Sequence, residues 1–199
     1  MLTSSELRAK ARAALGGQIF SNDWLMALVV CLISVAAGMV GAIPGIGGII
    51  SILITGAVYV GVQGYFLKLV RGQMTDLASV FNGFKNDFVG NFLLGFMQAL
   101  FIFLWSLLFL IPGIIATYSY SMVYYIKNDH PEYSWNECLK VSKQMMKGYK
   151  WKLFCLQFSF IGWYFVIIFI PFGIGSLFLA PYTTTATAAF YEELKAQNI

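Results

Sequence analysis

Uncharged apolar stretches alternate with short charged segments along the whole chain. Six stretches contain no charged residue: Trp24–Ile43, Ile46–Leu67, Phe92–Ile111, Ile114–Ile126, Leu153–Ile170 and Gly173–Tyr191. A helix of about 20 residues is about 30 Å long, which matches the hydrocarbon core of a bilayer. The pattern therefore predicts a polytopic membrane protein with six transmembrane helices, although the fourth stretch, at 13 residues, is short for a full crossing.

Turns that contain proline join these helices in pairs, at Pro44, Pro112 and Pro171. None of the 13 Lys and Arg or the nine Asp and Glu residues lies within the three hairpins. A charge at the centre of a bilayer costs roughly 3 kcal/mol or more, so we expect an all-α fold of three embedded hairpins tipped by proline and glycine. Two alternatives stay open, namely hairpins that re-enter without crossing and a second turn that is recessed below the outer surface.

The basic residues are distributed unevenly among the connecting segments. Three precede the first helix, three lie between the second and third, six lie between the fourth and fifth, and one follows the sixth. Because Lys and Arg favour the cytoplasmic side, this distribution predicts that both termini and both long loops are cytoplasmic. The N-terminus has no short apolar core before a small-residue cleavage site, so we expect no cleaved signal peptide.

A cytoplasmic amphipathic segment precedes each hairpin. The first and third segments begin with capping boxes, Thr3 with Glu6 and Ser134 with Glu137, and the second begins at Thr75-Asp76. Apolar residues then recur at helical spacing, and the segments end at or near Gly16, Gly83 and Gly148.

The recurring order of segment, glycine and hairpin has the form of an internal repeat. We interpret residues 1–199 as one membrane domain with candidate internal repeats 3–72, 73–133 and 134–195. Few residues are identical between the copies, so a common plan imposed by the bilayer remains the alternative to duplication. Small residues four apart, such as Ala57 and Gly61, favour close helix contacts within the membrane.

The composition supports an integral membrane protein, because 59% of the residues are apolar, 17% are aromatic and only 11% are charged. The net charge of +4 is modest, and the basic residues flank apolar stretches. They are therefore better explained by anionic lipid headgroups than by nucleic acid.

Five lysines gather in the third segment and at the boundary of the next hairpin: Lys140, Lys143, Lys147, Lys150 and Lys152. Tyr149 and Trp151 lie among the last of them. We expect this group to contact anionic lipid or a protein partner. Simple anchoring at the membrane surface and recognition of a specific headgroup both remain open.

The sixth apolar stretch contains a polar run, Pro181, Tyr182, Thr183, Thr184 and Thr185. Proline removes one helical hydrogen bond and frees the carbonyl of Leu177, which a threonine hydroxyl or a buried water must satisfy. Two interpretations follow. The helix is broken and builds an intramembrane site, or it is only kinked and the freed carbonyl accepts a hydrogen bond from a nearby polar group.

The sequence contains no recognisable catalytic motif. The only histidine, His130, has no second histidine to share a metal with, and Cys31, Cys138 and Cys155 lack metal-type spacing. We therefore expect no metal, no cofactor and no enzymatic activity. If the protein were an enzyme, the likeliest suppliers of acid or base would be Asp129, His130 and Glu132.

Several segments together resemble a bacterial family of integral membrane proteins, domain of unknown function 975: residues 105–115, 143–154, 159–163, 180–182 and 190–194, with Glu6 to Ala11 and Leu15-Gly16 at the N-terminus. The resemblance implies a multi-pass protein of the bacterial plasma membrane, and the family has no established activity to transfer. The plan is also distantly similar to the membrane portion of some glycerophosphodiester phosphodiesterases, which hints at a lipid connection. Their catalytic domain, with its metal-binding carboxylates, is missing from this chain.

From these observations we expect a non-enzymatic membrane protein that binds or organises membrane lipids, or that docks a membrane or cytoplasmic protein partner, through its amphipathic helices. The alternative is a carrier or channel for an amphipathic solute or lipid that uses a broken sixth helix.

Overall fold

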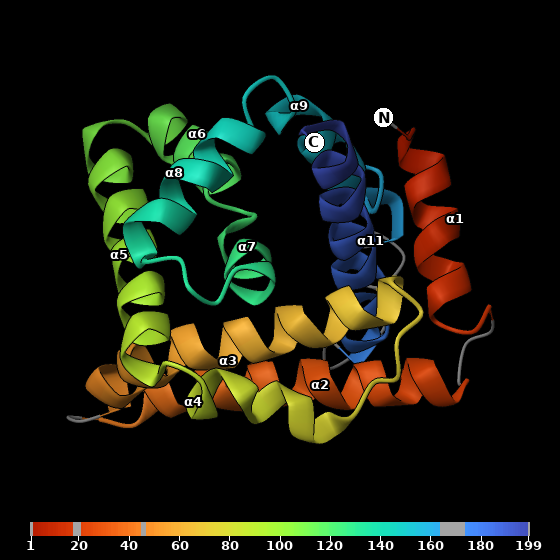
Figure 1. Cartoon of the computed structure of the whole chain (residues 1–199), viewed down its shortest axis with the longest axis horizontal. Helices are drawn as coiled ribbons and strands as arrows, with labels where there is room; N and C mark the ends of the chain where they lie inside the picture. The colour runs from red at the N-terminus through yellow and green to blue at the C-terminus, as the bar shows by residue number, and fades with distance from the viewer. Residues whose placement is uncertain (1, 18–20, 45–46, 164–173, 199) are drawn as a thin grey trace.

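The computed structural model describes residues 2–17, 21–44, 47–163 and 174–198, and within these ranges the chain is helical without a strand. The predicted all-α class is therefore confirmed. The helices are α1 (Ser4–Ala14), α2 (Asn22–Met39), α3 (Gly47–Val70), α4 (Asn82–Lys85), α5 (Phe88–Leu108), α6 (Leu110–Ser119), α7 (Val123–Asp129), α8 (Trp135–Met145), α9 (Lys150–Phe158) and α11 (Ile174–Asn198), with 3-10 helices η1 (Val40–Ala42) and η2 (Leu77–Phe81) (Figure 1).

Three described segments are helical, long and apolar enough to cross a membrane: Asn22–Ala42, Ile50–Val70 and Phe88–Leu107. They correspond to the first three predicted spans. The last seven residues of the fifth predicted span (164–170), together with the Pro171 turn, lie outside the described residues. The structure thus supports a membrane protein and leaves the arrangement of six spans in three hairpins as a prediction.

The second hairpin differs from its prediction at the turn. The chain reverses at Phe109, whose backbone is extended (φ −158°, ψ 148°), and α6 starts directly afterwards at Leu110. Pro112 therefore lies in the first turn of α6 and not at the tip. Proline is tolerated there because the first N–H groups of a helix have no helical acceptor.

The fourth predicted span is not one continuous helix, because α6 ends at Ser119 and α7 begins only at Val123. The carbonyls at the break accept hydrogen bonds from other helices. The Ser142 hydroxyl on α8 donates to the carbonyl of Ser119 at 2.8 Å, and the Gln98 amide on α5 donates to that of Tyr120 at 3.0 Å. These partners satisfy groups that a helix end would otherwise leave unpaired, so the prediction of a single helix here is wrong.

Helix α3 is the central element of the fold. It lies beside α2, and the segment η2–α4 runs along it (Figure 1). Ala57 and Gly61, the predicted contact pair, form the surface on which this segment packs. A Cβ atom added to Gly61 would lie 1.7 Å from the carbonyl oxygen of Val80, and one added to Gly83 would lie 2.0 Å from that of Ala57. Backbone therefore touches backbone, and the described part of α3 beyond Gly56 is largely buried.

The second amphipathic segment ends near Gly83, as predicted, but Gly83 is not the turn residue. Gly83 is buried inside α4, where it allows the contact with α3. The chain turns instead at Asp87, the one described non-glycine residue with positive φ (52°), whose carboxylate caps α5 by accepting from the N–H of Gly90. Gly16 and Gly148, which follow the other two segments, have φ of 83° and 86° as expected for such a turn.

Candidate functional site

The predicted lysine group lies on α8, α9 and the turn between them. Ser134 and Glu137 form the predicted capping box, in which the Glu137 carboxylate accepts from the Ser134 N–H at 2.7 Å. Helix α8 buries Cys138, Leu139 and Ser142, and Met146 is buried directly after it. The opposite side of the same helix is exposed and carries the first lysines.

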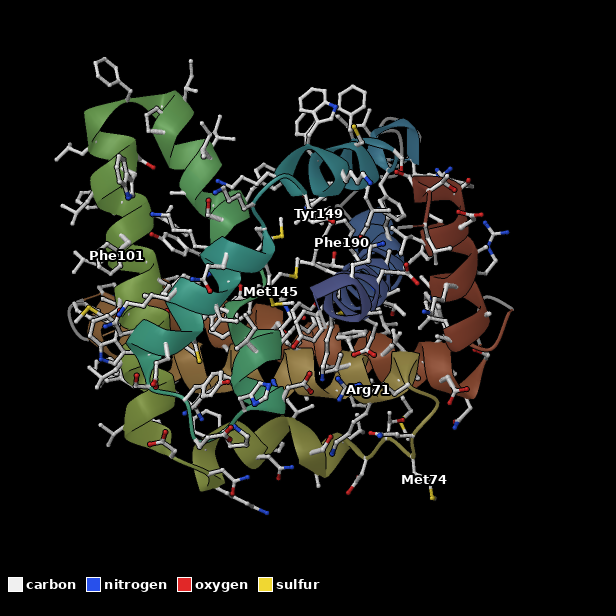
Figure 2. All side chains as sticks on the ribbon, turned by 45° about the horizontal axis from the view of Figure 1, so that its top comes forward. Arg71, Met74, Phe101, Met145, Tyr149 and Phe190 are labelled. Atoms are coloured by element: carbon white, nitrogen blue, oxygen red, sulfur yellow. The ribbon has the colours of Figure 1, made fainter. Side chains whose placement is uncertain are left out.

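None of these five lysines forms an ion pair with another residue in the part of the chain that the structure describes. Lys140, Lys143, Lys147 and Lys152 are exposed, and Lys150 is half-buried. Among the described residues, no carboxylate lies within ion-pair distance of any of them. The ammonium of Lys152 lies 5.5 Å from the centroid of the Tyr149 ring, which Figure 2 labels at the junction of α8 and α9. The result is a surface with excess positive charge.

Aromatic rings continue this surface along α9. Trp151 stacks on Phe154 with centroids 4.9 Å apart, and Phe154 stacks on Phe158 at 5.7 Å. Trp151 is 70% exposed and Phe158 is 56% exposed, so the outer rings face the surroundings of the protein. Lysines beside exposed aromatic rings are typical of the boundary between lipid headgroups and acyl chains. We call Lys140, Lys143, Lys147, Lys150, Lys152, Trp151, Phe154 and Phe158 the lysine–aromatic surface.

The second predicted site, in the sixth apolar stretch, does not contain a broken helix. Helix α11 runs from Ile174 to Asn198 with Pro181 inside it. The hydroxyls of Thr183 and Thr184 both donate to the carbonyl of Ala180, at 3.1 and 2.8 Å, and that of Thr185 donates to the carbonyl of Pro181 at 2.6 Å. These hydroxyls are therefore satisfied within the helix. Helix α11 is therefore not interrupted at Pro181.

Tyr182 takes part in packing between helices. Its ring meets Phe160 edge to face at 5.0 Å, and the Arg12 guanidinium of α1 lies 6.0 Å from the ring centroid. Its hydroxyl oxygen is buried without a hydrogen-bond partner among the described residues. Tyr182 thus connects α11 to α1 and to the turn after α9.

A cluster of ion pairs that the sequence did not reveal lies where three helices meet. Arg71 directly follows α3, Asp129 ends α7, and Glu192 lies in α11 (Figure 2 labels Arg71). Arg71 Nη2 lies 2.8 Å from the Asp129 carboxylate and 2.7 Å from that of Glu192. Lys195 Nζ and the Tyr191 hydroxyl also donate to Asp129, at 2.7 and 2.9 Å. We call Arg71, Asp129, Tyr191, Glu192 and Lys195 the ionic hub.

Asp129 is the most enclosed charge of the ionic hub, with only 6% of its side chain exposed. Burial opposes its ionisation, but the hydrogen bonds from Lys195, Arg71 and Tyr191 outweigh burial and hold the pKa of this carboxyl below its usual value. Two cations balance two carboxylates here, and the cations also lie near the negative ends of α3 and α7. The ionic hub is therefore satisfied as it stands and ties the three helix ends together.

A second buried charge, Lys127, joins α7 to the start of α5. Only 5% of Lys127 is exposed, and its ammonium donates to the Asp87 carboxylate at 2.8 Å and to the carbonyls of Pro131 and Tyr133 at 2.8 and 2.9 Å. The hydrogen bond from Lys127 lowers the pKa of Asp87. Three acceptors match the three ammonium hydrogens, which is the condition for keeping a cation inside a protein.

The residues considered for acid–base chemistry do not converge on one site. The Asp129 carboxylate belongs to the ionic hub, whereas His130 Nδ1 and the Glu132 carboxylate form an exposed pair at 3.1 Å. His130 also stacks on Tyr133 at 4.5 Å. Within the described part of the chain, no group of three His, Cys, Asp or Glu residues is placed to hold a metal ion.

One signal in the sequence could have located the ionic hub. Arg71, Asp129 and Glu192 each lie within a few residues of the end of the second apolar stretch of a hairpin. If the three hairpins start at the same depth, these charges lie at one level and can meet. The opposite signs of Arg71 and the two acids then favour pairing.

Comparison with known proteins places the chain in a family and assigns it no activity. The model of the family described as "Protein of unknown function (DUF975)" matches residues 1–119 and 107–198, which together span nearly the whole chain. Neither the curated proteins nor the solved structures gave a match. The chain therefore belongs to the DUF975 family of proteins of unknown function.

Proposed function

We propose that this protein is a non-enzymatic, multi-pass protein of the bacterial plasma membrane that binds anionic phospholipid headgroups through the lysine–aromatic surface. The observation that carries the proposal is the set of five lysines on α8 and α9 that lack a carboxylate partner among the described residues. Elsewhere, Arg71, Lys127 and Lys195 each pair with an acid. The unpaired cations lie beside exposed rings that suit the membrane interface.

The contacts of both termini support a cytoplasmic position for both. The N–H of Leu2 donates to Glu193 at 3.4 Å, and Lys10 Nζ lies 4.0 Å from the same carboxylate. The start of α1 and the end of α11 therefore belong on one side of the membrane. With the excess of Lys and Arg in the long loops, that side is the cytoplasm. Fluorescent-protein fusions at each end should both fluoresce if this orientation is correct.

Matched charge removal tests the headgroup proposal. Detergent-purified protein is titrated with phosphatidylglycerol or phosphatidylcholine, and bound lipid is counted by native mass spectrometry. Each lysine near an anionic surface contributes about 1 kcal/mol. The double variant Lys143→Gln/Lys147→Gln loses about 2 kcal/mol and should therefore bind phosphatidylglycerol roughly thirtyfold more weakly. Added salt should weaken binding by the wild type in the same direction.

The control is Lys68→Gln/Lys85→Gln, which removes the same charge from two other lysines that have no ion pair among the described residues. It should bind phosphatidylglycerol nearly as well as the wild type. Equal losses in the two double variants would mean that only net charge matters. Equal binding of phosphatidylcholine and phosphatidylglycerol by the wild type would contradict the proposal outright.

A further inference from the structure

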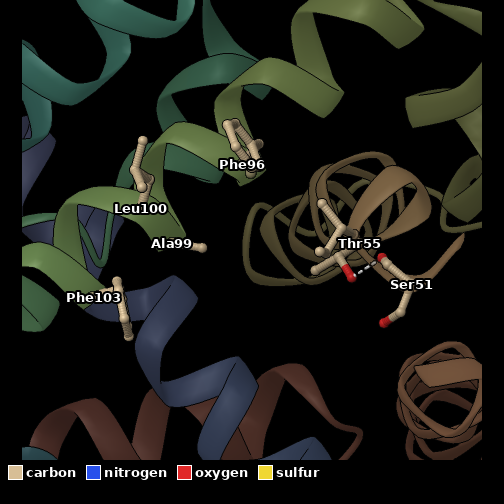
Figure 3. A pocket seen from close by; sticks show the side chains of 8 residues that line it. Ser51, Thr55, Phe96, Ala99, Leu100 and Phe103 are labelled. Atoms are coloured by element: carbon tan, nitrogen blue, oxygen red, sulfur yellow. Dashed lines mark hydrogen bonds between the residues drawn. The ribbon is translucent and has the colours of Figure 1, made fainter. Parts of the chain in front are cut away.

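Helices α3 and α5 cross each other, and their main chains meet where they cross. A Cβ atom on Gly95 would lie 2.6 Å from the Cα of Gly56, and one on Gly56 would lie 2.1 Å from the carbonyl oxygen of Asn91. The two main chains are therefore in direct contact at this crossing. Beside the crossing lies a groove of about 300 Å³, lined by Ser51, Ile52 and Thr55 of α3 and by Phe96, Ala99, Leu100 and Phe103 of α5 (Figure 3).

The walls of this groove are almost entirely apolar. Phe96, Ala99, Leu100 and Phe103 line it from α5, and Ile52 lines it from α3. The hydroxyl of Thr55 does not offer its hydrogen to the groove, because it donates to the carbonyl of Ser51 at 2.5 Å, the dashed bond in Figure 3. An apolar space with so few available polar partners does not hold water well.

The groove lies between two of the three helices that can cross a membrane, Ile50–Val70 and Phe88–Leu107. Phe103 is 62% exposed and Ile52 is 50% exposed, so the groove is continuous with the outer apolar surface of these helices. In a bilayer this surface faces hydrocarbon. If the groove were empty, the side chains that line it would lose dispersion contacts. A flexible hydrocarbon chain in the groove restores these contacts.

We infer that the groove binds one acyl chain of a membrane phospholipid, and that it holds this chain longer than the rest of the apolar surface holds its lipids. The geometry that creates the site is the glycine crossing, which brings the helices together at Gly56 and Gly95 with the groove beside it. The inference does not depend on the lysine–aromatic surface, since none of the groove residues belongs to it.

Photo-crosslinking in native-like membranes tests this inference. The protein is reconstituted with phosphatidylcholine that carries a diazirine within one acyl chain, illuminated, and digested for mass spectrometry. Crosslinks should concentrate on residues 51–55 and 96–103. The variant Ala99→Trp fills the groove with an indole without touching the glycine crossing, and it should lower these crosslinks at least fivefold.

Two further variants keep the result interpretable. Ala36→Trp makes the same change at an exposed position of α2, outside the groove, and should leave the crosslinks at 51–55 and 96–103 unchanged. Thr55→Val removes the hydroxyl and nearly keeps the shape, so it should change crosslinking by less than twofold if the occupant is an acyl chain. A large loss in Thr55→Val would indicate a polar occupant and overturn the inference, as would even labelling of α2, α3 and α5 that Ala99→Trp leaves unaltered.

The Lys143→Gln/Lys147→Gln variant separates this inference from the headgroup proposal. It should keep the groove crosslinks while it loses affinity for phosphatidylglycerol. If it loses the groove crosslinks as well, the two regions form one lipid site and the independent acyl-chain site is refuted.

Discussion

Replacing Asp129 with Asn tests whether the ionic hub holds the three helix ends together. The carboxylate accepts hydrogen bonds from Arg71, Lys195 and Tyr191 at 2.7 to 2.9 Å. All three donors bond to Oδ2, so an amide in its best orientation keeps its one acceptor oxygen there and places its NH₂ group at the Oδ1 position, against the Arg71 guanidinium. Asp129→Asn therefore removes the charge and adds a repulsive contact in a place where only 6% of the side chain is exposed.

The size of the effect follows from two opposing contributions. Hydrogen bonds to a charged group contribute about 1.5–3 kcal/mol each, so the three donors together give roughly 5–9 kcal/mol. Several kcal/mol of this is offset by the desolvation of Asp129, and Arg71 keeps its bond to Glu192 in the variant. We therefore expect a loss of about 3 kcal/mol in the free energy of unfolding. For a chain of this length that corresponds to roughly 6–12 °C in Tm.

The assay is thermal unfolding in a single detergent, followed by tryptophan fluorescence and by retention of a monodisperse peak on gel filtration. Glu132→Gln is the matched control, because it also neutralises an acid in the same loop, and Glu132 is 66% exposed outside the ionic hub. Its Tm should change by less than about 2 °C. If Asp129→Asn and Glu132→Gln unfold at the same temperature, the ionic hub does not stabilise the fold.

Three further outcomes are expected. Gly61→Ala should destabilise the protein by about 1–3 kcal/mol, because its Cβ would lie 1.7 Å from the carbonyl oxygen of Val80, whereas Gly38→Ala, with nothing within 4 Å, should leave Tm unchanged or higher. The pKa of Asp129 is lower in the folded state than in the unfolded state, so the charged carboxylate stabilises the fold above about pH 4. This stabilisation is lost as the pH falls through the lower pKa of the folded state. On acidification the Tm of the wild type should therefore drop more steeply than that of Asp129→Asn. Ser134→Ala should cost about 1 kcal/mol and speed amide hydrogen exchange in the first turn of α8, while Asn136→Ala, at an exposed position of the same helix, should not.

Local features of this chain were predictable from the sequence because their causes are local. The capping boxes of Thr3 with Glu6 and Ser134 with Glu137 both form, since each needs only residues three positions apart. The first three apolar stretches form the three described segments that are both long and apolar enough to span, because length and hydropathy determine that property.

Contacts between distant segments were not predictable in the same way. The ionic hub joins Arg71 to Glu192 across 121 residues and to Asp129 across 58. The similar positions of these residues at the ends of hairpins indicate a common level, but they do not specify which side chains pair. The break between α6 and α7 depends on Gln98 and Ser142, which belong to other helices. The chain turns at Asp87 and not at Gly83 because the close contact of Gly83 with Ala57 keeps it inside a helix. In each case tertiary packing decided between local alternatives.

The ionic hub also has a consequence for the order in which the protein matures. Arg71 and Asp129 leave the ribosome well before Glu192 and Lys195 are translated. During that interval only one contact of the ionic hub between the first two hairpins can form, the pair of Arg71 with Asp129, and Glu193 is not yet available to Lys10 of α1. Insertion of α11 then forms three ion pairs with earlier parts of the chain, at Arg71, Asp129 and Lys10. A nascent chain stalled before residue 192 lacks these pairs, so we expect membrane quality-control proteases to degrade it faster than the full chain.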